Sequence, residues 1–124
     1  LLIAVTVLTS LDDNNLRSVG ITHDVRTQVA CLTSLAVSSG CDGVVCSPHE
    51  ISLLRPDHPA PFRLVTPGVR PAGMATADQK RTMTPGEAAA AGVSDLVIGR
   101  PVTAAADPLA ALQAIRTELV QPAA

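Results

Sequence analysis

Two arginines, each placed shortly after a buried strand, are the residues best suited to chemistry. Arg70 follows Leu64-Val65 across a Pro-Gly turn, and Arg100 directly follows Ile98-Gly99. Short apolar runs bounded by Pro and Gly are typical of parallel strands covered on both faces. Ligands bind at the C-terminal ends of such strands. Two guanidinium groups at that edge would suit an anion, most of all a phosphate.

Three further residues complete the candidate binding site. Gly99 lets a ligand approach the backbone closely and offers its N–H to an anion. Gln79 lies in a loop of small residues, and its amide can donate to a phosphate oxygen while accepting from a base or ribose group. Thr9 follows the first strand at the same end of the sheet, where its hydroxyl can bind a ligand or cap the next helix.

Each of these residues also has an interpretation without a ligand. Arg100 could pair with a nearby carboxylate at the surface. Arg70 and Gln79, taken alone, could simply face solvent in their loops. The residue pattern by itself leaves these alternatives open.

Helices with clear start signals separate the predicted strands. Ser47-Pro48-His49-Glu50 and Thr84-Pro85-Gly86-Glu87 are capping boxes, and Asp24 and Asp107 also precede helical patterns. The β-α-α-β-α-β-α-β-α order predicts a parallel sheet, in a barrel or in a doubly wound fold. We expect strands at residues 1–7, 42–46, 64–65 and 96–98, helices at 12–19, 24–39, 47 onward, 84–92 and 107 onward, and an apolar stripe of Leu109, Leu112, Ile115 and Leu119 in the last helix.

Composition narrows the class of protein. A length of 124 residues suits one domain, and 47% hydrophobic with 16% charged residues indicates a globular chain. A net charge of −2, one Phe and no Trp or Tyr argue against a nucleic-acid partner. The apolar start is too short to cross a membrane and lacks the basic residues of a signal peptide. Three cysteines without metal-ligand spacing suggest reduced, buried thiols in a cytoplasmic protein.

Several separated segments resemble the C-terminal motifs of the bacterial orotidine 5'-phosphate decarboxylase family. They are 64–71 (LVTPGVRP), 78–81 (DQKR), 83–85 (MTP) and 97–103 (VIGRPVT), with 4–10 (AVTVLTS) and 42–47 (DGVVCS) in the same order. Several blocks in order are more specific than any one of them. The resemblance runs nearly from end to end of the chain.

The resemblance implies a fold and an activity. Residues 1–124 would form the C-terminal half of one (β/α)8 TIM barrel, from strand five to strand eight. The complete enzyme would convert orotidine 5'-monophosphate to UMP and carbon dioxide in pyrimidine synthesis, with no metal or organic cofactor. It would be a homodimer with the active site shared across the interface. Positions matching Arg70, Gln79, Gly99 and Arg100 would bind the phosphate and neighbouring groups, and Thr9 the pyrimidine.

The family's catalytic residues are missing from this sequence. Their outline is Lys-x-Asp-Lys-x-x-Asp, whereas Lys80 is the one lysine here and lies in the expected phosphate loop. His23, His49 and His58 are isolated, and we expect all three to be exposed. The chain starts within a strand and without Met, and family members are about twice as long. We therefore expect a fragment that is inactive alone.

Two other functions fit parts of the pattern. A sugar-phosphate decarboxylase or aldolase of the same superfamily would share the fold, although such enzymes lack the Gln79 contact to a nucleotide. A non-enzymatic module that binds a phosphorylated ligand would need only the two arginines. A Lys-x-Asp-Lys-x-x-Asp run upstream would favour the decarboxylase over both.

Overall fold

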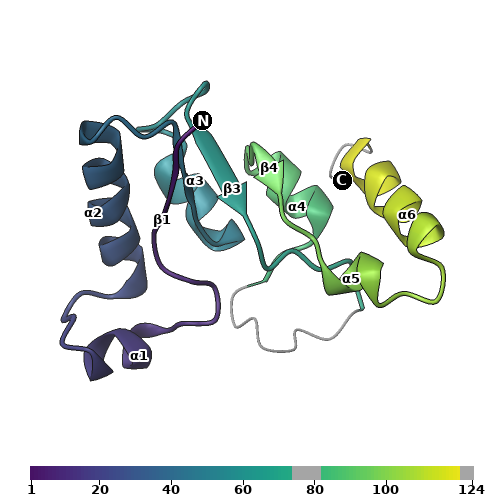
Figure 1. Cartoon of the computed structure of the whole chain (residues 1–124), viewed down its shortest axis with the longest axis horizontal. Helices are drawn as coiled ribbons and strands as arrows, with labels where there is room; N and C mark the ends of the chain where they lie inside the picture. Colours follow the sequence, from purple (N-terminus) through teal and green to yellow (C-terminus); the bar gives the residue numbers. More distant parts are fainter. Residues whose placement is uncertain (74–81, 121–124) are drawn as a thin grey trace.

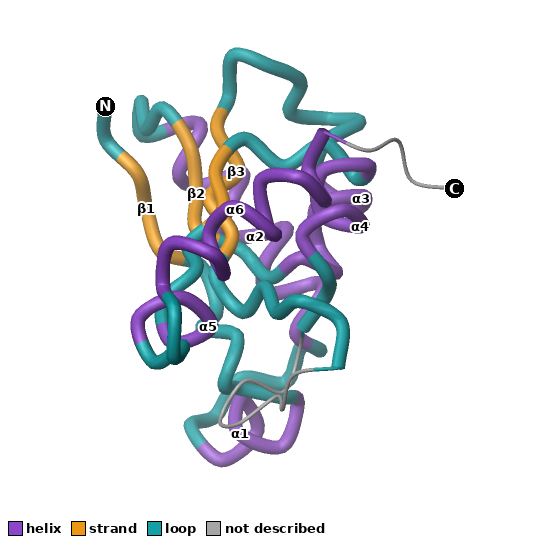
Figure 2. Tube along the Cα trace, turned by 90° about the vertical axis from the view of Figure 1, so that its right-hand side faces the viewer, coloured by secondary structure: helices purple, strands orange, loops and turns teal. Residues whose placement is uncertain are grey.

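Four parallel strands form a single sheet at the centre of the molecule. The computed structural model describes residues 1–73 and 82–120. The strands are β1 (Ile3–Val5), β2 (Gly43–Val45), β3 (Arg63–Thr66) and β4 (Asp95–Leu96), hydrogen-bonded in that order and all parallel. Figure 2 shows β1, β2 and β3 side by side. The order follows the chain without the reversal that defines a doubly wound sheet, so the described part has the topology of a barrel wall.

Helices connect successive strands and begin at the predicted capping residues. Asp24 Oδ1 accepts from the Thr27 N–H at 2.7 Å, and both predicted capping boxes are formed. The short helix that starts at Arg100 is an element that no sequence pattern predicted. The helices are α1 (Asp13–Ser18), α2 (Val25–Ser38), the 3-10 turn η1 (Pro48–Glu50) leading into α3 (Ile51–Leu54), α4 (Pro85–Ala90), α5 (Arg100–Thr103) and α6 (Pro108–Val120) (Figure 1).

One face of the sheet packs beneath the helices and forms the core. Val44 and Leu64 on neighbouring strands are fully buried, as are Val29 of α2 and Ile51 of α3. Burying a side chain of this size stabilises the fold by about 1.5–3 kcal/mol. The buried residues of α2 recur three and four positions apart, as in an amphipathic helix.

The opposite face of the sheet is apolar and largely uncovered in the described part of the chain. Val5, Val45 and Val65 share this face through the strand register, and the side chain of Val5 is 59% exposed. Arg63 lies on the same face as Val65, since side chains alternate along a strand. A parallel sheet is normally buried on both faces, but residues 1–73 and 82–120 leave this face partly exposed.

The predicted apolar stripe of α6 is buried at one of its four positions. Ile115 is 4% exposed, but Leu109, Leu112 and Leu119 are 65%, 45% and 37% exposed. Helix α6 packs against α4 and α5 (Figure 1), with Ala111, Ile115 and Glu118 on its inner side. Leu119 instead borders an open groove of about 510 Å³ beside β4, which Ala89, Val93 and Leu96 also line. Leu119 is partly exposed because nothing in the described chain fills this groove.

Two smaller predictions about burial are also wrong. His58 is half-buried rather than exposed, because its ring lies 5.4 Å from the ring of Phe62. Cys31 is exposed on α2, and Cys46 alone of the three free thiols is buried. Both differences arise where a turn or a helix face packs in a way that residue type does not reveal.

Candidate functional site

The chain that leaves β3 is fixed by backbone contacts up to Arg70. Val69 is fully buried and forms a parallel bridge with Met83. The N–H of Arg70 donates to the Met83 carbonyl at 2.9 Å, and Gly68 before them has a φ of 76°, which favours glycine. The backbone of Arg70 is therefore held at the C-terminal end of β3, where the sequence predicted it.

The side chain of Arg70 is only lightly held by the described residues. Its guanidinium donates one long hydrogen bond, 3.4 Å, to the carbonyl of Val69. It lines a cavity of about 240 Å³ together with Thr84 and Glu87. Hydrogen bonds from the Thr84 N–H and hydroxyl lower the pKa of Glu87, so this carboxyl group is ionised at neutral pH. The cavity thus combines a cation with a carboxylate that is already engaged in capping α4.

Gly99 and Arg100 lie where the chain leaves β4 and turns into α5. The Val97 N–H donates to the Thr66 carbonyl at 2.9 Å, which extends the β3–β4 pairing toward this turn. Gly99 is the N-cap of α5, and its carbonyl accepts from Val102 and Thr103 at 2.9 Å each. A Cβ at Gly99 would meet nothing within 4 Å. The protein's own packing does not require glycine there, whereas close approach of a ligand would.

A single cavity brings the two arginine positions together. Pro71, which follows Arg70, and Pro101, which follows Arg100, line the same apolar space of about 220 Å³, with Ala111, Ala114, Ile115 and Glu118 of α6 on its other side. Pro101 is buried. Because proline fixes its own φ and restricts the residue before it, both arginine backbones are stiffened next to this cavity. The residues that follow Arg70 and Arg100 therefore border one space, and the convergence of the two arginine side chains stays a prediction.

The structure describes Thr9 but not Gln79, the other two predicted site residues. Thr9 is 4% exposed and lies in the turn after β1, the other edge strand of the sheet. Asp12 caps α1 through the Asn15 N–H, so the alternative in which Thr9 or Ser10 caps this helix is wrong. Gln79 lies outside the described residues.

Two residues near the site were missed by the sequence reasoning, Pro101 and Glu118. The repeated Arg-Pro pair, at Arg70-Pro71 and Arg100-Pro101, was a visible signal for the first. No pattern marked Glu118, because its position depends on how α6 packs.

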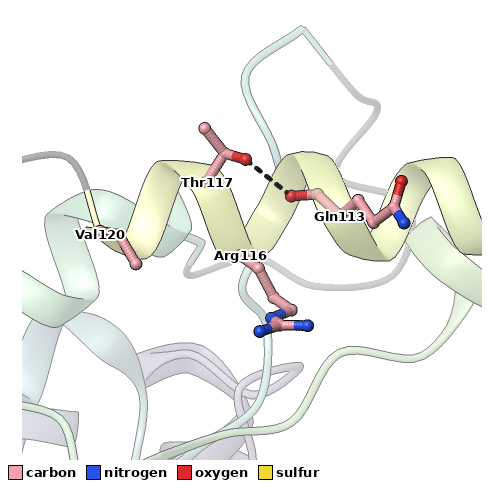
Figure 3. Close-up of a pocket in the computed structure, with 4 residues that line it drawn as sticks. All are labelled: Gln113, Arg116, Thr117 and Val120. Atoms are coloured by element: carbon pink, nitrogen blue, oxygen red, sulfur yellow. Dashed lines mark hydrogen bonds between the residues drawn. The ribbon is translucent and has the colours of Figure 1, made fainter.

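A separate groove of about 500 Å³ runs along α6 and contains none of the predicted site residues. Gln113, Arg116, Thr117 and Val120 line it. Figure 3 shows Arg116 extending from α6 on the side away from the Thr117 hydroxyl, which donates to the Gln113 carbonyl at 3.0 Å. Its described lining comes from one helix, so it offers no convergent set of groups for a ligand.

The described residues provide neither a cluster of metal ligands nor a membrane-spanning helix. Among residues 1–73 and 82–120, no three His, Cys, Asp or Glu side chains come together in a way that could hold a metal ion. The helices in this part of the chain also lack the length and hydropathy of a membrane span.

Comparison with known proteins identifies relatives along nearly the whole chain. It is 53% identical over 119 residues to an orotidine 5'-phosphate decarboxylase from Idiomarina loihiensis, covering 96% of this chain and 52% of the relative. It is 54% identical over 122 residues to the protein of the same name from Shewanella sediminis, covering 98% and 52%. The chain therefore spans about half the length of the curated relatives it matches.

The fold agrees with these relatives. The crystal structure of the orotidine 5'-phosphate decarboxylase from Lactobacillus acidophilus superposes with a TM-score of 0.79 at 41% identity, covering 96% of this chain and 49% of that one. The family model for orotidine 5'-phosphate decarboxylase / HUMPS matches residues 1–115. The chain belongs to the orotidine 5'-phosphate decarboxylase / HUMPS family.

Proposed function

We propose that this chain supplies the phosphate- and pyrimidine-binding half of an orotidine 5'-phosphate decarboxylase. In this proposal β1 to β4 are strands five to eight of a (β/α)8 barrel, and residues 1–124 are its C-terminal half. The complete enzyme converts orotidine 5'-monophosphate to UMP and carbon dioxide. Identity above 50% to relatives of that name supports this activity over the other phosphate-binding functions of the same fold.

The observation that carries the proposal is the pair of Arg-Pro turns around one cavity. Arg70 follows β3 and Arg100 follows β4, two neighbouring parallel strands. The prolines after them line the same space of about 220 Å³. Loops after the last two strands of a (β/α)8 barrel commonly bind phosphate. Two arginines there can donate several charge-assisted hydrogen bonds to a phosphate dianion.

Each site residue then has a role in binding the nucleotide. Arg70, Arg100 and the Gly99 N–H bind the phosphate, and Gln79 contributes its amide between phosphate and base. Thr9, at the end of β1, binds the pyrimidine edge. Energy from the phosphate contacts holds the carboxylate against catalytic groups elsewhere, so that remote binding energy lowers the barrier to decarboxylation.

The catalytic lysine and aspartates come from outside this chain in the same proposal. Lys80, the one lysine, belongs to the phosphate loop. The enzyme acts in the cytoplasm as a homodimer with its active site shared across the interface, and it uses neither a metal nor an organic cofactor. The open apolar face that includes Val5, Val45 and Val65 is covered by the other half of the barrel.

Co-expression with the missing half tests this proposal. The partner is the first half of the Idiomarina loihiensis relative, joined to this chain or expressed beside it; we refer to the product as the completed enzyme. We expect it to release carbon dioxide from orotidine 5'-monophosphate, and the chain alone to be inactive and prone to aggregate. Decarboxylation by the purified chain alone would show that the catalytic residues have been misplaced.

A further inference from the structure

A carboxylate of α6 holds the start of α4 in place. Glu118 Oε1 accepts a hydrogen bond from the Gly86 N–H at 3.1 Å, across 32 residues of sequence. Gly86 is in the first turn of α4, whose free N–H groups attract negative charge. Thr84 and Glu87 satisfy other groups of the same turn. Glu118 is thus the contribution of α6 to a helix start that is otherwise capped locally.

The side chain of Glu118 packs closely against the backbone of Gly86. A Cβ added at Gly86 would lie 3.4 Å from both Cγ and Oε1 of Glu118. A larger side chain would push the carboxylate away from the N–H that it now accepts from. The hydrogen bond from the Gly86 N–H to Glu118 therefore depends on a residue without a side chain at position 86.

The same carboxylate side chain borders the cavity behind the two arginines. Glu118 and Ile115 face Pro71 and Pro101 across a space of about 220 Å³. Helix α4 also follows directly from Met83, whose carbonyl accepts from the Arg70 N–H. The hydrogen bond between Glu118 and Gly86 therefore connects α6 to Arg70 in two ways. One is through Met83, which bonds to the Arg70 N–H, and the other is through Pro71 in the cavity wall.

We propose that Glu118 is a positioning residue for the phosphate contacts of Arg70 and Arg100. It fixes α6 against the start of α4, so that the two Arg-Pro turns keep their spacing around the shared cavity. Glu118 touches no ligand in this account. The inference rests on the proposed function and adds to it a residue that places the phosphate-binding groups.

The test compares UMP with uridine as ligands of the completed enzyme. We expect Glu118→Ala to weaken UMP binding roughly tenfold, because small displacements of positioned groups are costly, and to leave uridine binding unchanged. Glu118→Gln keeps an oxygen acceptor and should restore most of the UMP affinity. Gly86→Val, which displaces the carboxylate without removing it, should show the same selective loss if Glu118→Ala does not fold.

Gln113→Ala is the matched control, because Gln113 is another long polar side chain of α6 that faces solvent; its UMP affinity should be that of the unsubstituted enzyme. Unchanged UMP affinity in Glu118→Ala and Gly86→Val, or equal losses for UMP and uridine, would overturn the positioning role alone. Failure of the unsubstituted completed enzyme to bind UMP would instead overturn the proposed function, and this inference with it.

Discussion

The two ends of the sheet each carry two arginines, but the protein holds them in different ways. At the N-terminal end, Arg55 donates five hydrogen bonds of 2.8–3.0 Å, to the carbonyls of Gly92, His58 and Phe62 and to the Ser94 hydroxyl. Arg63 pairs there with Asp95 through contacts of 2.5 and 2.9 Å. At the C-terminal end, the guanidinium of Arg70 has one bond of 3.4 Å within the described residues.

Arg55 and Arg63 are thus held by side-chain contacts, whereas the described contacts of Arg70 are mainly those of its backbone. Arg55 uses all of its donors on groups that would otherwise be unsatisfied where α3, β3 and β4 meet. At the other end the backbone is what the protein fixes, through Pro71, Pro101 and the Arg70–Met83 hydrogen bond. In (β/α)8 barrels the N-terminal end serves stability and the C-terminal end carries the active site. The contacts of Arg55 and Arg63 fit the first part of that division, and a ligand site at the C-terminal end stays a prediction.

The largest effect on stability is expected at Arg55. Arg55→Ala in the completed enzyme should lower the free energy of unfolding by about 3 kcal/mol, because several carbonyls lose a charged donor at once. Urea unfolding measures this change. Arg26→Ala, at an exposed arginine of α2, is the control. Its free energy of unfolding should stay within about 0.5 kcal/mol of that of the unsubstituted enzyme. A loss for Arg55→Ala no larger than for Arg26→Ala would remove the structural role assigned to it.

Two glycines at opposite ends sharpen the comparison. A Cβ at Gly43 would overlap the Arg63 carbonyl oxygen and lie 2.8 Å from the Arg63 Cβ, whereas one at Gly99 would meet no protein atom within 4 Å. Gly43→Ala should therefore destabilise the fold by about 2 kcal/mol. Gly99→Ala should leave stability unchanged and weaken UMP binding roughly tenfold, by obstructing the ligand. Thermal unfolding and UMP titration of both variants check this prediction. A stability loss in Gly99→Ala with unchanged stability in Gly43→Ala would contradict it.

The smallest effect is expected for the ion pair between Arg63 and Asp95. The hydrogen bond with Asp95 raises the pKa of Arg63, but the side chains are 38% and 39% exposed. Such an exposed pair contributes little to stability. Asp95→Asn should lower the free energy of unfolding only slightly at low salt, and the difference should vanish in 1 M salt, where the Debye length is about 3 Å. A large loss of unfolding free energy in Asp95→Asn that does not depend on salt would contradict this prediction. It would show that the other half of the barrel buries the pair in the completed enzyme.

Local signals in the sequence predicted most of the fold. Capping residues such as Asp24 and Thr84 act within one helical turn, so their roles can be assigned from neighbouring residues alone. Apolar runs likewise predicted the four described strands, although the last was expected at 96–98 and β4 covers Asp95–Leu96. The strand order required the structure, because residue pattern did not distinguish a barrel from a doubly wound sheet.

Features that depend on distant contacts could not be predicted in the same way. The exposure of Leu109 and Leu112 follows from α6 packing on α4 and α5 rather than along its apolar stripe. The contact between Glu118 and Gly86 joins two helices that no local pattern connects. Residue types suggested Arg70 and Arg100 as site residues, whereas the cavity shared by Pro71 and Pro101 depends on the fold.

The most direct test of the account is the affinity of the completed enzyme for UMP when one arginine at a time is removed. Arg100→Ala should weaken UMP binding by about 3 kcal/mol, roughly a hundredfold, because a charge-assisted phosphate contact is lost. Arg63→Ala, at the opposite end of the same sheet, should bind UMP as the unsubstituted enzyme does, and uridine should bind both variants equally. Unchanged UMP affinity in Arg100→Ala, or an equal loss in Arg63→Ala, would contradict a phosphate site at the C-terminal strand ends.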